Sequence, residues 1–399
     1  MNNAFTYFNS NDGTGLFGFG TIDYLEFKVS DDLELIQSFI DKYKSNYIFS
    51  NLSFDLKNKV ENLTSDNPDN LSFPLATFWI PKTVVKIENG KLSFVQGTDT
   101  TENRHRILTF LAKEKESLQI NHSTELRPRT SKKDYLEHVN QLKKEIQYGN
   151  IYEVNYCQEF YAENYNLIDG EALYFKLNKL TQAPFSSYIR LNNFELFCGS
   201  PERFIKKRNS KIISQPIKGT KKRGSSQEED ELLKANLLSD PKERSENVMI
   251  VDLVRNDLSK IALKNSVKVD ELFGIYSFKT VHQMISTISC EIPKEVNFIA
   301  ILKALFPMGS MTGAPKISAL KLIEKHEEFK RGIYSGAMGY FSPNGDFDFN
   351  VVIRTLVYNS SNNYLSCSVG GAITIQSNPE AEYDECFTKI QSILNCINE

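Results

Sequence analysis

The hydrophobic pattern of the chain changes between strand-like and helical stretches in blocks. Between residues 151 and 217, apolar runs rich in β-branched and aromatic residues follow one another and are interrupted by turn signals. A second group of strand-like runs extends from residue 334 to 375, and helical periodicity lies between and after the two groups. Strands and helices in separate blocks favour an α+β fold with antiparallel sheets over a regular βαβ alternation.

Short turn and cap signals predict further elements. Turns that contain Asn-Gly separate apolar runs at 88–90 and at 343–345, and both favour β-hairpins. Helical periodicity predicts helices near 31–44 and 101–117. No chemistry is evident in this first part of the chain.

A polar stretch at 121–134 is the best candidate for a domain boundary, because it is poor in apolar residues. It includes Ser131, an expected N-cap for a helix that runs to Gly149. We therefore expect an N-terminal accessory lobe over 1–125 and a second domain over 126–399.

One later helix carries a carboxylate on its apolar side. Asp240 precedes a proline and predicts the start of a helix over 241–259. Within it, Glu246 lies four residues before Ile250, on the stripe that the apolar residues form. A carboxylate that faces an interior needs a cation or a proton.

The closing helix repeats this arrangement. It is expected to begin after Asn378, and Glu382, Glu385 and Lys389 lie on a line beside its apolar stripe. Acids from two helices that face one interior indicate a Mg²⁺ site completed by substrate oxygens and water. Exposed acids that pair with lysines along each helix account for the spacing equally well.

Two more segments suggest anion binding. The sequence GAPK at 313–316 opens a predicted helix whose first amides, with Thr312 and Lys316, could hold an anion, although a tight helix start explains the same residues. Arg354 alternates with apolar residues, so we place it on an apolar strand face. A guanidinium there grips a substrate carboxylate or phosphate, or pairs with an internal aspartate.

Composition excludes several classes of protein. The 399 residues are 40% hydrophobic and 24% charged with a formal net charge of -3, which is ordinary for a globular protein and gives no field for nucleic acid. No apolar stretch approaches the roughly 18 residues of a membrane span, and no leader is evident, so we expect a cytoplasmic protein. Six cysteines without CxxC spacing argue against zinc and disulfides.

The basic run at 203–223 holds nine Lys/Arg and no Asp/Glu. A solvated hairpin or an anion-binding surface would each explain it. Within it, Lys218 stands apart in the sequence SQPIKGTKKRG, since it lies between a proline and a glycine. Taken alone, Lys218 reads as a solvated turn lysine.

Seven segments in order carry a family resemblance. They are SPERF, PIKGT, SENVMIVDLVRNDL, GSMTGAPK, YSGAMGYFSPNGDFDFNVVIRT, VGGAI and EAEYDECFTK. With them, residues 130 to 396 resemble the chorismate-utilising enzymes, which include anthranilate, isochorismate, salicylate and aminodeoxychorismate synthases. The resemblance implies antiparallel β-sheets packed as a sandwich and flanked by helices.

The resemblance also implies a covalent mechanism. PIKGT resembles the variant found in aminodeoxychorismate synthase component I, whereas anthranilate synthases typically carry alanine where Lys218 stands. Lys218 would attack C2 of chorismate, the 4-hydroxyl would leave with a proton from Glu202, and ammonia would then enter at C4. A free amine at Lys218 requires desolvation or nearby cations, for which Lys316, Lys389 and the metal are candidates.

Further roles follow from the resemblance alone. Glu246 and Glu385, with Glu382 close by, match Mg²⁺ ligands. Tyr334 and Arg354 match residues that hold the enolpyruvyl carboxylate, and the amides around Gly370 and Gly371 match its backbone donors. His282 matches a histidine near the ring, although a core role explains a lone histidine equally well. The remaining predicted substrate-binding residues are Thr312, Lys316 and Lys389.

Some features indicate which enzymes of the family the chain resembles most and which partner proteins it needs. Glu153 falls where the water-adding synthases place a lysine base, which disfavours those enzymes. No cysteine lies in a G-x-C-x-G elbow, so we expect ammonia from solution or from a separate glutamine amidotransferase subunit. We likewise expect pyruvate release to need another enzyme. The rival interpretations are anthranilate synthase component I and a non-catalytic scaffold that binds an amidotransferase.

Overall fold

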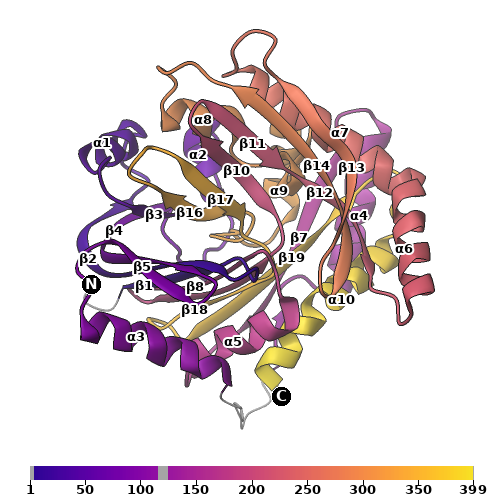
Figure 1. Cartoon of the computed structure of the whole chain (residues 1–399). Helices are drawn as coiled ribbons and strands as arrows, with labels where there is room; N and C mark the ends of the chain where they lie inside the picture. The colour runs from indigo at the N-terminus through magenta and orange to yellow at the C-terminus, as the bar shows by residue number, and fades with distance from the viewer. Residues whose placement is uncertain (1–3, 116–124, 399) are drawn as a thin grey trace.

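The computed structural model describes residues 4–115 and 125–398. In these residues, 19 strands form one hydrogen-bonded network in which the recorded strand pairs are antiparallel. Helices lie around the outside of the strands (Figure 1). The predicted α+β class, with antiparallel sheets flanked by helices, is confirmed.

The strands of this network are β1 (Phe5–Asn9), β2 (Thr14–Phe27), β3 (Ile48–Leu52), β4 (Ala76–Glu88), β5 (Lys91–Gln96), β6 (Arg127–Pro128), β7 (Glu153–Ala162), β8 (Phe185–Leu191), β9 (Phe194–Ser200), β10 (Arg203–Arg208), β11 (Lys211–Gln215), β12 (Ile217–Lys222), β13 (Lys268–Ser277), β14 (Val281–Glu291), β15 (Gly313–Ala314), β16 (Ala337–Phe341), β17 (Phe347–Val351), β18 (Thr355–Asn359) and β19 (Tyr364–Ile373).

The α-helices are α1 (Glu34–Lys42), α2 (Lys57–Val60), α3 (Thr101–Ala112), α4 (Lys132–Gln147), α5 (Gly170–Thr181), α6 (Gln227–Ser239), α7 (Pro241–Ser259), α8 (Phe298–Leu305), α9 (Lys316–His326) and α10 (Pro379–Asn398). Short 3₁₀ turns occupy Phe54–Leu56, Lys113–Lys115 and Gly309–Met311.

Local signals placed several elements correctly. Glu88 pairs with Lys91 across Asn89 and Gly90, which have φ values of 48° and 78°, as a two-residue hairpin requires. The second predicted hairpin joins β16 to β17. Ser131 caps α4, since its hydroxyl accepts the Asp134 amide at 3.2 Å. The helix predicted over 101–117 is α3 with a 3₁₀ turn after it, and positions 116 and 117 lie outside the described residues.

Strands from the first 125 residues hydrogen-bond to strands from later in the chain. β1 pairs with β8, and β3 pairs with β16. The boundary near residue 125 stays a prediction, and the two parts that it separates share one network of strands.

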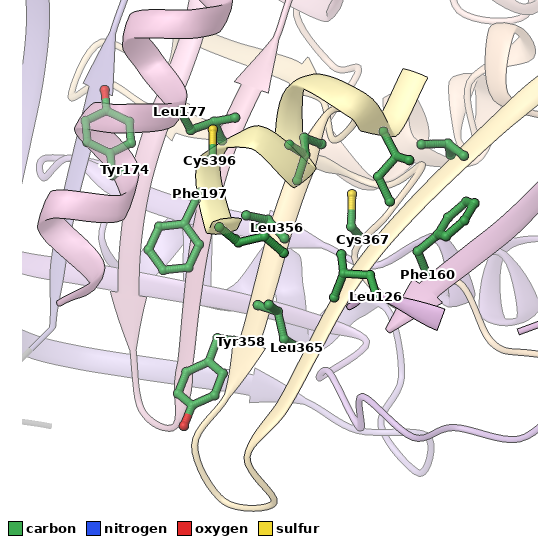
Figure 2. Packing of buried hydrophobic residues seen from close by; sticks show 14 of the residues in the cluster. Leu126, Phe160, Tyr174, Leu177, Phe197, Leu356, Tyr358, Leu365, Cys367 and Cys396 are labelled. Carbon is green, nitrogen blue, oxygen red and sulfur yellow. The ribbon is translucent and has the colours of Figure 1, made fainter. Parts of the chain in front are cut away.

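The C-terminal helix anchors one side of the network. α10 buries Cys386, Ile390, Ile393 and Ile397, as its periodicity predicts. Near its end, Figure 2 shows the helix packed over β18 and β19, where Leu356 and Cys367 belong to the same buried cluster. The first turns of α10, which carry the predicted acids, also lie beside β19, since Glu382 approaches Gly371 of that strand.

The basic run forms β10, β11 and β12, and acids from other segments neutralise much of its charge. Ion pairs join Arg203 to Asp348 at 2.9 Å, Lys211 to Asp270 at 3.0 Å and Lys218 to Glu153 at 2.7 Å. The two interpretations of the basic run, a solvated hairpin and an anion-binding surface, are therefore both incomplete, because carboxylates of the protein pair with its cations. Among the described helices, none is long and apolar enough to cross a membrane.

Candidate active site

Lys218 lies in a bulge of β12. Pairing between β12 and β14 shifts register between Ile217 and Thr220, and Gly219 has a φ of 91° that other residues rarely adopt. Bulges redirect side chains. The Lys218 side chain is only 12% exposed, and its Nζ contacts Glu153 Oε1 of β7 at 2.7 Å. A solvated turn lysine is therefore excluded.

Carboxylates surround the Lys218 amine. Burial alone lowers the pKa of Lys218, but the charges of Glu153, Glu246 and Glu202 outweigh it, so the pKa lies above its usual value. The expectation that nearby lysines assist the free amine is wrong. Lys316 and Lys389 are held by carboxylates of their own, so their charges are already compensated.

Glu202 lies between β9 and β10 and is 3% exposed. The Ser310 hydroxyl donates to its Oε1 at 2.7 Å. Burial raises the pKa of Glu202 to about 7, although the Ser310 hydrogen bond and the Lys218 charge oppose the shift. A carboxyl with this pKa is substantially protonated near neutral pH, as a general acid must be.

Glu246 lies on the buried side of α7, whose predicted span of 241–259 is confirmed. Asp240 caps the helix by accepting the Lys242 and Glu243 amides at 3.0 and 3.2 Å. Burial raises the pKa of Glu246 to about 7. Its recorded ion-pair partner, Lys242, is 3.9 Å away, so the carboxylate is weakly compensated.

The acids of α10 lie against β19. Glu382 is buried, and burial raises its pKa. Glu385 is half-exposed; burial alone would raise its pKa, but the 2.7 Å ion pair with Lys389 lowers the pKa overall. Lys389 also donates to the Gly370 carbonyl at 2.6 Å. A Cβ at position 371 would lie 3.1 Å from Glu382 Oε2, so Gly371 allows the strand and helix to approach.

Glu246, Glu382 and Glu385 could supply some of the ligands of a hard divalent cation. Within residues 4–115 and 125–398, no three His, Cys, Asp or Glu side chains form a ready-made metal site. Glu246 and Glu382 are nevertheless buried carboxylates with raised pKa values, and the charge of Lys242 acts on Glu246, Glu382 and Glu385. Such a donor set fits Mg²⁺, which takes few carboxylates and completes its shell with water and substrate oxygens.

Arg354 is placed differently from the prediction. It lies in the bend between β17 and β18 with a φ of 51°, so the alternation argument for a strand position is wrong. Burial lowers the pKa of its guanidinium, and the described residues offer this side chain no recorded carboxylate or hydrogen bond. The internal Arg–Asp pair is therefore excluded. A left-handed backbone at a non-glycine residue is costly and is often found at functional sites.

Tyr334 is buried beside Cys157 and Phe329, and burial raises the pKa of its hydroxyl well above the usual value. It donates its backbone amide to the Arg331 carbonyl in a tight turn. Tyr334 therefore stays neutral and can act only as a hydrogen-bonding group.

Three predicted substrate-binding residues have partners elsewhere in the protein. Lys316 Nζ contacts Asp257 Oδ2 at 2.6 Å. The Thr312 hydroxyl donates to backbone carbonyls at 3.2 and 3.3 Å. His282 is fully buried between Ser277 and Asp230, 2.8 Å from each. These contacts support the tight-helix-start and core interpretations.

Sequence reasoning gave no role in the site to three residues, although it noted Glu153 as a difference from the water-adding synthases. Glu153 holds Lys218, Ser310 orients Glu202, and Lys242 lies beside the acids. The predicted strand over 151–162 carries two carboxylates, Glu153 and Glu159, among mainly apolar residues, and this was a usable signal for Glu153 because buried carboxylates need a partner. Neither Ser310 nor Lys242 has a comparable signal.

A cavity of about 610 Å³ lies close to these residues. Its lining includes Phe185, Arg203, Tyr340 and Ile217, the residue before Lys218, but none of the predicted site residues. The candidate active site is thus defined by converging charged side chains and not by this cavity.

Comparison with known proteins fits this fold and site. The family model described as chorismate binding enzyme matches residues 7–395. The chain therefore belongs to the chorismate-binding enzyme family.

Within the family, two groups of relatives are similar to the chain. Aminodeoxychorismate synthase component 1 of Escherichia coli is 40% identical over 264 residues, which cover 66% of this chain and 57% of that protein. The chloroplastic aminodeoxychorismate synthase of Arabidopsis thaliana is 39% identical over 68% of this chain and 30% of that protein. Anthranilate synthase component 1 of Cereibacter sphaeroides is 31% identical over 87% of this chain and 72% of that protein.

The chain thus matches little more than half the length of the bacterial relatives named aminodeoxychorismate synthase component 1. Solved structures agree in fold. Anthranilate synthase component I of Streptococcus pneumoniae superposes with a TM-score of 0.80 at 23% identity, covering 96% of this chain and 92% of that chain. Escherichia coli MenF superposes with a TM-score of 0.78 at 18% identity, covering 99% and 89%.

Proposed function

We propose that this chain acts as component I of an aminodeoxychorismate synthase, converting chorismate and ammonia to 4-amino-4-deoxychorismate for 4-aminobenzoate and folate synthesis. One observation carries the proposal: the side chain of Lys218 in PIKGT is only 12% exposed and faces a group of carboxylates instead of solvent. The 40% identity to proteins named aminodeoxychorismate synthase component 1 supports the same branch.

Lys218 is the nucleophile in this proposal. Its free amine attacks C2 of chorismate, the ring double bonds shift, and the C4–O bond breaks. Glu202 gives the departing hydroxyl its proton, which suits a buried carboxyl with a pKa of about 7. Ammonia then attacks C4 and the lysine leaves C2, so the amine acts as a nucleophile and then as a leaving group.

Binding groups orient the substrate for this step. Arg354 has no recorded internal carboxylate partner among the described side chains, so its guanidinium can hold the enolpyruvyl carboxylate, with Tyr334 and the amides near Gly371 as further donors. Glu246, Glu382 and Glu385 would hold Mg²⁺, which supplies positive charge for the ring carboxylate. Lys389 keeps Glu385 ionised through their ion pair.

Ammonia comes from a separate glutamine amidotransferase subunit in this account, as the name component 1 of the relatives suggests. A reducing cytoplasm suits the buried thiols of Cys157, Cys198, Cys290, Cys367 and Cys386, which form no disulfide. The isolated chain should turn over with ammonium, but with glutamine only after the partner is added.

Product analysis tests the proposal. The protein is incubated with chorismate, magnesium and ammonium, with and without an added aminodeoxychorismate lyase, and products are identified by mass spectrometry. Aminodeoxychorismate that becomes 4-aminobenzoate only with the lyase supports the proposal. Fluorescent anthranilate would assign the chain to the anthranilate synthase branch, and unchanged chorismate would favour a non-catalytic scaffold.

Metal dependence is tested separately. Excess chelator should abolish product formation, and added magnesium should restore it. Glu382→Gln removes a buried carboxylate and should raise the magnesium concentration needed for half-maximal activity, while Glu380→Gln at an exposed neighbour serves as the control. Full activity in excess chelator would remove the metal from the proposal.

A further inference from the structure

Glu153 is an unusual partner for an amine. It lies on β7 and is 1% exposed, and Oε1 contacts Lys218 Nζ at 2.7 Å. Its other oxygen, Oε2, is buried and has no hydrogen-bond partner among the described residues. A buried carboxylate oxygen without a donor is costly, so this ion pair is not built for stability alone.

The other acids near Lys218 have different engagements. Glu202 accepts from Ser310, and Glu246 is 3.9 Å from Lys242. Glu243 and Glu385 also feel the Lys218 charge, but no hydrogen bond or ion pair joins either to its amine in the described structure. Among the described residues, Glu153 is the recorded contact of Nζ and lies at proton-transfer distance.

We propose that Glu153 is a catalytic base that takes the proton from the Lys218 ammonium before attack and returns it when the lysine leaves. This inference rests on the proposed function, in which Lys218 is the nucleophile. Proton transfer between the two groups neutralises both at once, so no isolated charge remains in the buried site.

The proton balance closes over one turnover. Lys218 gives one proton to Glu153 and attacks C2 as a free amine, and Glu202 gives one proton to the departing hydroxyl, which leaves as water. The adduct is then a secondary ammonium. Attack of ammonia on C4 breaks the C2–N bond, and Lys218 leaves as a neutral amine that recovers its proton from Glu153. The new C4 ammonium returns one proton to Glu202. Glu202 is then protonated again and Glu153 is ionised again, as at the start of the turnover.

Single-turnover formation of the lysine adduct tests the proposal. The full chain is mixed with chorismate and magnesium without ammonia, and the adduct is followed by intact mass at pH 7.5. If Glu153 is the base, Glu153→Gln slows adduct formation by about 100-fold or more, the usual size of a general-base contribution. If Glu153 only keeps Lys218 charged, its removal frees the amine, and the rate stays equal or rises, which would overturn the proposal.

Two further variants sharpen the result. Glu243→Gln removes a carboxylate that faces β12 without touching Nζ, and it should leave the adduct rate within about twofold of the parent. If Glu153→Gln does not fold, Glu153→Asp decides the matter. It keeps the charge but withdraws the oxygens from the amine, so a rate at least tenfold below the parent supports the base, and a parental rate overturns it.

Failure of the proposed function would look different. In that case the parent protein itself forms neither a Lys218 adduct nor aminodeoxychorismate. A parent that forms the adduct, together with an equally fast Glu153→Gln variant, refutes only the role of Glu153.

Discussion

Two lysines that are largely shielded from solvent, Lys218 and Lys316, each meet one carboxylate at nearly the same distance. Lys316 contacts Asp257 at 2.6 Å, and Lys218 contacts Glu153 at 2.7 Å. The surroundings of the two pairs differ. Asp257 accepts from Lys260 at Oδ1 and from Lys316 at Oδ2, so both of its carboxylate oxygens have a donor. Lys316 Nζ also lies 3.4 Å from the Leu305 carbonyl.

At Lys218 the hydrogen bonding is incomplete. One oxygen of Glu153 has no donor in the described structure, and two further carboxylates, Glu202 and Glu246, have pKa values near 7 because they are buried. Burial lowers the pKa of Lys316, whereas the surrounding carboxylates raise the pKa of Lys218 despite its burial. A buried ion pair with complete hydrogen bonding is typical of a structural role. A buried ion pair that lacks a hydrogen-bond donor is typical of a functional site.

The largest expected difference between the two lysines is in product formation. Lys218→Ala should abolish the adduct and the aminodeoxychorismate product, because no other amine replaces the nucleophile. Lys218→Arg should be equally inactive, since a guanidinium stays protonated. Product assays by mass spectrometry measure both. If Lys218→Ala formed aminodeoxychorismate at the parental rate, Lys218 would have no more part in the chemistry than Lys316.

The next effect concerns Glu202, which belongs to the surroundings of Lys218. Glu202→Gln removes the proton donor and should slow hydroxyl departure by about 100- to 10,000-fold. Because the pKa of Glu202 is about 7, its acid form prevails below pH 7 and is lost as the pH rises. In the parent, the adduct rate should therefore carry a decline above pH 7, and the variant should lack it. A variant with the parental rate and the same decline would show that another group is the acid.

Lys316 should matter for stability. Lys316→Met leaves Asp257 without its buried partner and should lower the free energy of unfolding by about 3–5 kcal/mol. Urea titration measures this loss, and the adduct at Lys218 should still form in the folded fraction. The double variant Lys316→Met/Asp257→Leu should regain part of the stability. Normal stability with loss of the adduct would instead place Lys316 in the chemistry.

The smallest expected effect is at Arg354, a partly buried cation. Arg354→Lys keeps the charge but loses the two-pronged geometry, which should cost about 1.5–3 kcal/mol of transition-state stabilisation. This corresponds to a fall in kcat/KM of about 10- to 150-fold. A kcat/KM within twofold of the parent would show that the Arg354 guanidinium has a structural role, like the Lys316–Asp257 pair.

Features set by neighbouring residues were predictable from sequence. The span of α7 follows from Asp240 and the adjacent proline, and Glu246 then falls on the buried side by helical periodicity. The same reasoning holds for α10 and its buried stripe.

Features set by distant residues were not predictable. Lys218 and Glu153 are 65 residues apart and meet only because β12 and β7 are placed by the whole sheet. The bend at Arg354 was missed because neither glycine nor proline marks that position, and apolar alternation continues across it. Tertiary contacts override local pattern at these places.

Peptide mapping of the parent protein tests the central distinction most directly. The chain is incubated with chorismate and magnesium without ammonia, digested, and searched for lysines that carry the mass of chorismate less one water. The account predicts this modification on Lys218 and none on Lys316. Modification of Lys316, or an unmodified Lys218 in a preparation that makes aminodeoxychorismate once ammonium is added, would contradict it.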